Sequence, residues 1–142
     1  MKKIMFIFLT FFCSMVYSQE WIITDKVTIM ENKDFPDVLM EMATIELGSN
    51  TKTSFNNFYG LGWMHIGENA KVEVRGDSNS PNLFSIKMRN NACIRFTKEV
   101  DFSRISIESV GKNYKIILPK EVYKTIRARN INIIYSDTIT CD

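Results

Sequence analysis

Hydrophobic and polar residues alternate along most of the chain beyond residue 20. Residues 71–74 place two valines on one side and charged residues on the other, and residues 83–88 repeat the pattern with larger apolar side chains. Alternation with a period of two is typical of a β-strand that has one buried face. Similar patterns predict strands at residues 21–30, 38–47, 92–97, 104–109, 114–118 and 131–135.

Turn-forming residues separate the predicted strands. A Gly-Ser-Asn turn follows one strand at 48–50, and residues 75–82, rich in Gly, Asp, Ser, Asn and Pro, connect two others. We interpret 75–82 as a hairpin connection, and its Arg-Gly-Asp tripeptide as part of the turn and not as an integrin ligand. The chain shows no internal repeat and no linker. Short strands with regular turns therefore predict one mainly β domain, an antiparallel β-sandwich or barrel.

One segment has a helical period instead. Leu118, Val122 and Ile126 are four residues apart, which places them on one face of a helix. Pro119 suits the first helical position, where its missing N–H group has no intrahelical partner to lose. The pattern predicts one short helix near residues 119–129, packed on the sheet.

The first eighteen residues have the pattern of a secretory signal peptide. Lys2 and Lys3 precede an apolar run at 4–16, and Ser18 supplies a small residue at the cleavage position. The run is too short for a transmembrane anchor, and the short basic start is typical of a bacterial signal. We expect cleavage after Ser18 and a single β-rich exported domain over residues 19–142. The mature protein would be secreted or periplasmic, without membrane anchoring.

Signal cleavage also changes the charge balance. The chain has 18 Lys and Arg and 16 Asp and Glu, and the signal segment holds two of the lysines and none of the acids. The mature chain therefore has no net charge. Because nucleic-acid binding relies on an excess of positive charge, we expect no nucleic-acid partner.

Cysteine usage predicts one disulfide. Cys13 would leave with the signal segment, where the preceding phenylalanines disfavour lipidation, and Cys93 and Cys141 would remain. Two cysteines in an exported domain usually oxidise. Cys93 also shares its strand face with Arg95, away from the core and within reach of the C-terminal residues. We predict the pair Cys93–Cys141, with two separate free thiols as the alternative. Two cysteines without nearby histidines are too few for a metal site, so no metal or cofactor is expected.

The sequence offers few catalytic groups. His65 is the single histidine, which excludes a multi-histidine metal site, and no nucleophile-elbow motif surrounds a serine. We therefore assign no catalytic residue. A pair of carboxylates could still hydrolyse a glycosidic bond, so a carboxylate-dependent hydrolase stays open as an alternative function.

Residues 55–65 concentrate aromatic, amide and glycine residues. We take Tyr59, Trp63 and His65 as ligand-binding candidates, because aromatic faces beside polar donors occur in carbohydrate- and peptide-binding surfaces. The alternative is that Trp63 belongs to the core. Together these features predict a small exported non-enzymatic binding module that acts on a protein or glycan partner. A periplasmic inhibitor or immunity-type protein that neutralises a toxin is an alternative form of this function.

Overall fold

Most strands expected from the alternation are present, but residues 21–30 form two strands, and the strands at residues 33–35, 52–55 and 58–66 were not predicted. A computed structural model of the chain describes residues 20–76, 83–98, 105–120 and 133–142. Within these ranges the regular secondary structure consists of twelve β-strands and no α-helix. The strands are β1 (Trp21–Ile23), β2 (Lys26–Ile29), β3 (Lys33–Phe35), β4 (Val38–Leu47), β5 (Lys52–Phe55), β6 (Phe58–Ile66), β7 (Lys71–Val74), β8 (Leu83–Met88), β9 (Cys93–Phe96), β10 (Ile105–Ser109), β11 (Lys115–Leu118) and β12 (Ile133–Tyr135).

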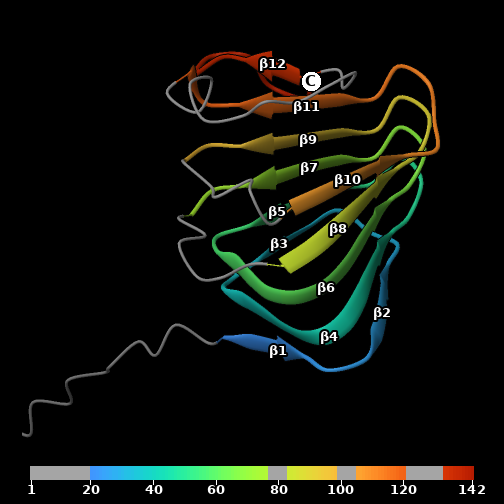
Figure 1. Cartoon of the computed structure of the whole chain (residues 1–142), viewed down its shortest axis with the longest axis vertical. Coiled ribbons are helices and arrows are strands. Elements are labelled where there is room, and N and C mark those ends of the chain that lie inside the picture. The colour runs from blue at the N-terminus through green and yellow to red at the C-terminus, as the bar shows by residue number, and fades with distance from the viewer. Residues whose placement is uncertain (1–19, 77–82, 99–104, 121–132) are drawn as a thin grey trace, which may run out of the picture.

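From β4 to β11 the strands alternate between two sheets. One sheet has the order β1-β4-β6-β8-β10, with β2 also paired to β4, and we call it sheet A. The other, sheet B, has the order β12-β11-β9-β7-β5-β3. Every strand pairing in the described part of the chain is parallel. The chain therefore winds in successive coils that stack from β1 to β12 (Figure 1). This architecture is a β-solenoid.

The predicted antiparallel sandwich or barrel is wrong. Consecutive strands such as β7 and β8 lie in different sheets and do not pair with each other, so the predicted hairpin pairing is wrong; residues 77–82 of the connection lie outside the described residues. Alternation failed to reveal this because a strand with one buried face has the same period whether its neighbours run parallel or antiparallel. The helix expected near 119–129 falls mostly on residues 121–132, outside the described residues, and Pro119 and Lys120 are not α-helical.

The coils have a repeat that the alternation conceals. Asn50, Asn69, Asn91 and Asn113 lie nineteen or twenty-two residues apart, and each has a positive φ between 55° and 61°. Each asparagine forms the corner that leads into a strand of sheet B. Asparagine tolerates this left-handed conformation better than most residues, so the same residue recurs at the same corner of each coil. The expectation of no internal repeat is therefore also wrong.

The corner asparagines also bond to one another. The Nδ2 of Asn69 donates to Oδ1 of Asn50 at 3.2 Å, and the Nδ2 of Asn91 donates to Oδ1 of Asn69 at 3.1 Å. Backbone bonds between neighbouring corners accompany these contacts, for instance from Asn69 N to Asn90 O at 3.0 Å. This asparagine ladder keeps the coils in one register.

The interior is filled by apolar rows that run across the strands. In sheet A the fully buried side chains of Ile45, Met64 and Ile86 stand opposite one another in register. Residues between the buried positions point outward and form the outer faces of both sheets. Equivalent buried rows in sheet B contain Thr53, Val72, Ile94 and Ile116, and Phe55, Val74 and Phe96.

Candidate functional site

The three predicted ligand-binding residues share the outer face of β6. Tyr59, Trp63 and His65 alternate along the strand with the buried residues Phe58, Met64 and Ile66. Trp63 is 44% exposed, and the two other candidates are partly exposed. Trp63 is therefore not part of the solenoid core, and the structure brings all three candidates to one surface.

A β-bulge lies beside this surface. The register between β4 and β6 shifts between Glu41 and Ala43, and Met42 at the bulge has a φ of 55°. Gly60 faces the bulge with a φ of 113°, and a Cβ atom there would lie 2.1 Å from the carbonyl oxygen of Met40. The glycine is thus required for the close approach of the two strands. Figure 1 shows both strands bending along their length.

Hydroxyl side chains flank the exposed indole. Thr44 on β4 and Ser85 on β8 are the register partners of Trp63, and both are partly exposed. Adjacent strands lie about 4.8 Å apart, so Thr44 and Ser85 are the nearest neighbours of Trp63 across the outer face. An apolar ring between two hydroxyl groups can stack on a ligand and form hydrogen bonds to it at the same time.

A row of charged side chains borders the indole on one side. Glu46, His65 and Lys87 stand in register on neighbouring strands. The carboxylate of Glu46 accepts from Lys26 Nζ at 2.9 Å and lies 3.5 Å from His65 Nδ1. The hydrogen bond from Lys26 is the main cause that holds the pKa of Glu46 below its usual range. Glu108 on β10 extends the row as the register partner of Lys87, so this border presents carboxylate, imidazole and ammonium groups.

Exposed apolar side chains lie on the opposite side of the indole, together with Glu41, the exposed register partner of Leu61. Leu61 on β6 is 39% exposed, and Ile22 on β1 is 52% exposed. Leu39 joins them, because it pairs in register with both Ile22 and Tyr59. We call the outer face of sheet A around these residues the Trp63 face.

The predicted disulfide is confirmed. Cys93 on β9 is bonded to Cys141, with a Cα–Cα distance of 5.7 Å. Arg95, two residues further along β9, donates from Nη2 to the carbonyl oxygen of Asp137 at 3.3 Å. The bond thus ties the C-terminal segment 136–142, the tail, to the outer face of sheet B.

Sequence reasoning missed a second polar site, which lies under the tail. Lys52 on β5, Lys71 on β7 and Asp142 come together at the rim of a pocket of about 440 Å³. A sequence signal for this site exists, because a lysine or cysteine follows two positions after each corner asparagine, and the coils align these positions. The series is Lys52, Lys71, Cys93 and Lys115.

The carboxylate of Glu73 in this region lies between two arginine side chains, Arg75 and Arg95. Partial burial raises the pKa of Glu73, but hydrogen bonds from Arg75 and Arg95 outweigh burial and leave that pKa below its ordinary value. A general acid in glycoside hydrolysis needs a raised pKa instead. Among the described residues, no three His, Cys, Asp or Glu side chains are grouped so that they could hold a metal ion.

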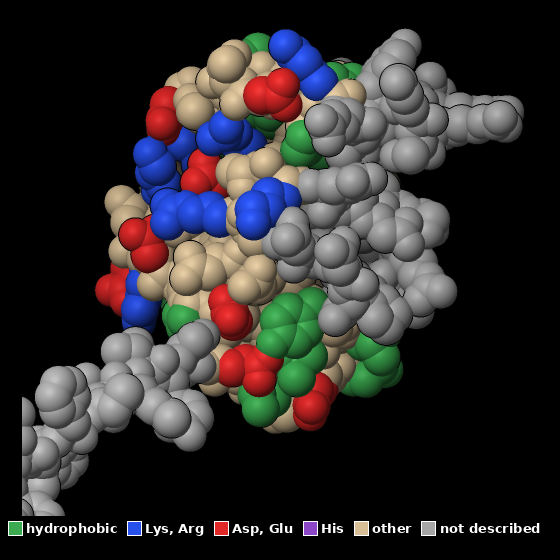
Figure 2. Space-filling view, turned by 90° about the vertical axis from the view of Figure 1, so that its left-hand side faces the viewer, with side chains coloured by type: hydrophobic (Ala, Val, Ile, Leu, Met, Phe, Trp, Pro, Cys, Tyr) green, Lys and Arg blue, Asp and Glu red, His purple; other side chains and the backbone are tan. Residues whose placement is uncertain are grey.

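Basic and acidic side chains are intermixed on the face shown in Figure 2, with hydrophobic side chains gathered in its lower part.

In the described part of the chain, no helix has the length and apolar character needed to cross a membrane. Comparison of the chain with protein-family models, with curated proteins and with solved structures finds no match.

Proposed function

We propose that this chain is an exported binding module that binds a carbohydrate chain through the Trp63 face. The observation that carries the proposal is the exposed indole of Trp63 between the hydroxyl groups of Thr44 and Ser85. A sugar ring has apolar C–H faces and a rim of hydroxyl groups. The indole supports stacking on the former, and the two side-chain hydroxyls with the charged border support hydrogen bonds to the latter.

The charged groups beside Trp63 favour binding of a carbohydrate over its hydrolysis. Glu46 and Glu108 lie in the charged row that borders Trp63, and the hydrogen bond from Lys26 holds the pKa of Glu46 below its usual range. An ionised carboxylate can accept hydrogen bonds from sugar hydroxyls but cannot act as a general acid. Export is supported by the signal-like N-terminal segment and by the Cys93–Cys141 bond, since disulfides persist outside reducing compartments.

Polysaccharide binding by the purified domain tests this function. The probe is a panel of immobilised neutral and acidic polysaccharides, and binding of wild type is compared with that of Trp63→Ala. Loss of a stacking residue at the centre of a site should weaken binding by about thirtyfold or more. Ile139→Ala removes an equally exposed apolar side chain from the tail and should leave binding unchanged. Wild-type binding by Trp63→Ala, or no binding by wild type to any polysaccharide, would contradict the proposal.

A protein partner is the second candidate. Ile22 and Leu61 extend the exposed indole into an apolar patch, and such patches with a central tryptophan occur at protein interfaces. An inhibitor or immunity-type protein would use its surface in this way. Capture of one protein from a periplasmic extract by wild type, but not by Trp63→Ala, combined with no polysaccharide binding, would favour this candidate over the first.

A further inference from the structure

Two lysines stand directly opposite one another on the outer face of sheet B. Lys52 on β5 is the register partner of Lys71 on β7, and both ammonium groups are accessible to solvent. Like charges in directly opposed positions destabilise a sheet. The pair therefore favours an anion that contacts both ammonium groups.

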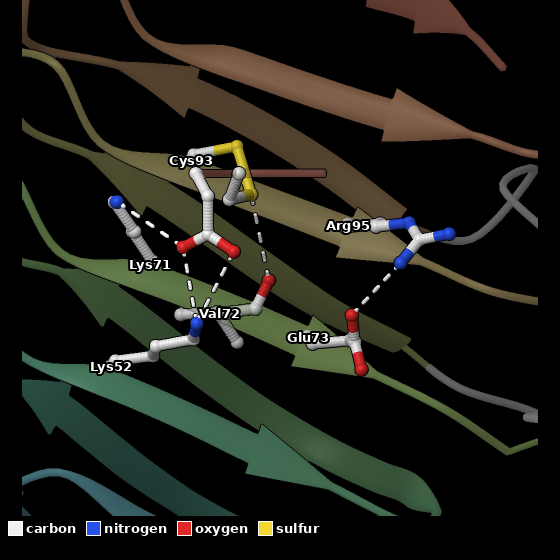
Figure 3. The surroundings of a disulfide bond; sticks show 8 residues. Lys52, Lys71, Val72, Glu73, Cys93 and Arg95 are labelled. Atoms are coloured by element: carbon white, nitrogen blue, oxygen red, sulfur yellow. Dashed lines mark hydrogen bonds and ion pairs between the residues drawn. A yellow bond between two sulfur atoms is a disulfide. The ribbon is translucent and has the colours of Figure 1, made fainter. Parts of the chain in front are cut away.

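The tail supplies that anion. Asp142 Oδ1 lies 3.1 Å from Lys52 Nζ and 3.4 Å from Lys71 Nζ, and Oδ2 lies 3.3 Å from Lys52 Nζ. Figure 3 shows Lys52 and Lys71 reaching toward the same carboxylate group. The two lysines thus already form a carboxylate-binding geometry.

The disulfide accounts for the position of this carboxylate. Cys93 is the next residue after Lys71 in the same row across sheet B, so Cys141 is tied one strand away from the lysine pair. Asp142 follows Cys141 and reaches the pair through this tether, which raises its local concentration. Its ion pairs are exposed, and exposed ion pairs contribute little by themselves. A ligand with further contacts can therefore displace Asp142.

The pocket beside Asp142 determines which carboxylate fits. Its volume of about 440 Å³ is within the range of small-molecule sites. Most residues of the lining are polar or charged, including Asn32, Ser54, Glu73 and Thr140, and the side chain of the one aliphatic residue, Val72, is buried in the core. Such a lining offers hydrogen bonds to the hydroxyl groups of a ligand, and apolar surface of similar extent that can contact the C–H faces of a sugar ring.

We propose that Lys52 and Lys71 form a binding site for the carboxylate of an acidic sugar, and that Asp142 is a tethered substitute that occupies the site when no ligand is bound. The sugar carboxylate takes the place of the Asp142 side chain between the two ammonium groups. The sugar hydroxyls enter the adjoining pocket. This site lies on sheet B, so it does not depend on the Trp63 face or on the function proposed for it.

Titration of the purified domain with sodium glucuronate, followed by calorimetry or NMR, tests the proposal. Asp142→Asn keeps the shape of the tail but removes the competing charge, so it should bind glucuronate about fivefold or more tightly than wild type. Adding Lys71→Gln to Asp142→Asn should abolish that gain. Lys115→Gln is the matched control, because Lys115 stands in the same row of sheet B but contributes nothing to the pocket lining.

Three results would overturn the inference. The first is equal affinity of Asp142→Asn and wild type for glucuronate, and the second is a gain that survives Lys71→Gln. The third is tighter binding of acetate, inorganic sulfate or a triglutamate peptide than of glucuronate, which would show that the pocket does not recognise a sugar. Melting temperatures of all variants should match wild type within a few degrees, because the substituted side chains are solvent-exposed.

Discussion

At the scale of single residues, exposure of one large aromatic side chain distinguishes a surface role from a core role. Tryptophan is usually well buried in folded domains. In β6 the alternation turns Met64 into the core and Trp63 to the surface, although the two residues are adjacent in sequence. Strand geometry therefore assigns opposite roles to two neighbouring apolar residues.

This assignment predicts opposite stability effects for the two residues. Trp63→Ala should lower the free energy of unfolding by less than about 1 kcal/mol, because the indole fills no space in the core. Met64→Ala should lower it by about 2–5 kcal/mol, because truncation of a fully buried methionine leaves a cavity. Urea denaturation of the two variants measures both values. A loss above about 3 kcal/mol for Trp63→Ala would show that the indole packs in the core and would remove the Trp63 face as a site.

At the scale of elements, the corners between strands decide how the coils stack. Each corner asparagine combines a left-handed backbone with a side-chain amide that can bond to the next coil. These are separate contributions, because glycine can adopt the left-handed backbone but has no side-chain amide to bond to the next coil. Asn69 has both neighbours of the ladder, so it is the position at which the two contributions can be separated.

Two substitutions at Asn69 should therefore differ in stability. Asn69→Gly keeps the left-handed corner and loses the two amide bonds, which should cost about 1 kcal/mol. Asn69→Ala loses the same bonds and also strains the backbone, for a total cost of about 2–3 kcal/mol. Thermal denaturation of the variants gives the order of their stabilities. Asn56→Ala is the control, since Asn56 is exposed and outside the ladder and should change stability by less than about 0.5 kcal/mol. Equal effects of glycine and alanine at position 69 would argue against backbone strain at the corner.

At the scale of the whole molecule, one covalent bond links the tail to the middle of the solenoid. Each coil otherwise contacts mainly the coils next to it, so tertiary contacts between distant parts of the chain are scarce. Cys93 and Cys141 are 48 residues apart in sequence. Their bond therefore restricts the unfolded chain over a long loop and holds the tail against sheet B.

Loss of this bond should destabilise the protein. Closure of a loop of this length contributes about 3–4 kcal/mol in the chain-entropy description, so reduction should lower the melting temperature by about 10 °C. Differential scanning calorimetry with and without dithiothreitol measures the change. The Cys93→Ser/Cys141→Ser variant should melt at the lower temperature and should not respond to dithiothreitol. An unchanged melting temperature on reduction would mean that the tail adds no stability.

The local features of this protein could be predicted from the sequence because they depend on near neighbours. Strands at residues 38–47, 71–74 and 83–88 have the predicted bounds, since alternation requires only that one face of a strand be buried. Tyr59, Trp63 and His65 were chosen from the composition of residues 55–65, and the strand that places them on one side was not predicted. The Cys93–Cys141 bond followed from the small number of cysteines and the strand face of Cys93.

By itself, then, the sequence determined that the chain is mainly β, which residues of the predicted strands share a face, and which cysteines pair. Only the tertiary structure decided that the strands run parallel in coils, because period-two alternation is the same for either strand direction. Only the register between coils decided that Thr44 and Ser85 flank Trp63, and that Lys52 stands opposite Lys71. These partners lie about twenty residues apart in the sequence. The hydrogen bonds between strands that align them do not change the alternation of apolar and polar residues within any one strand.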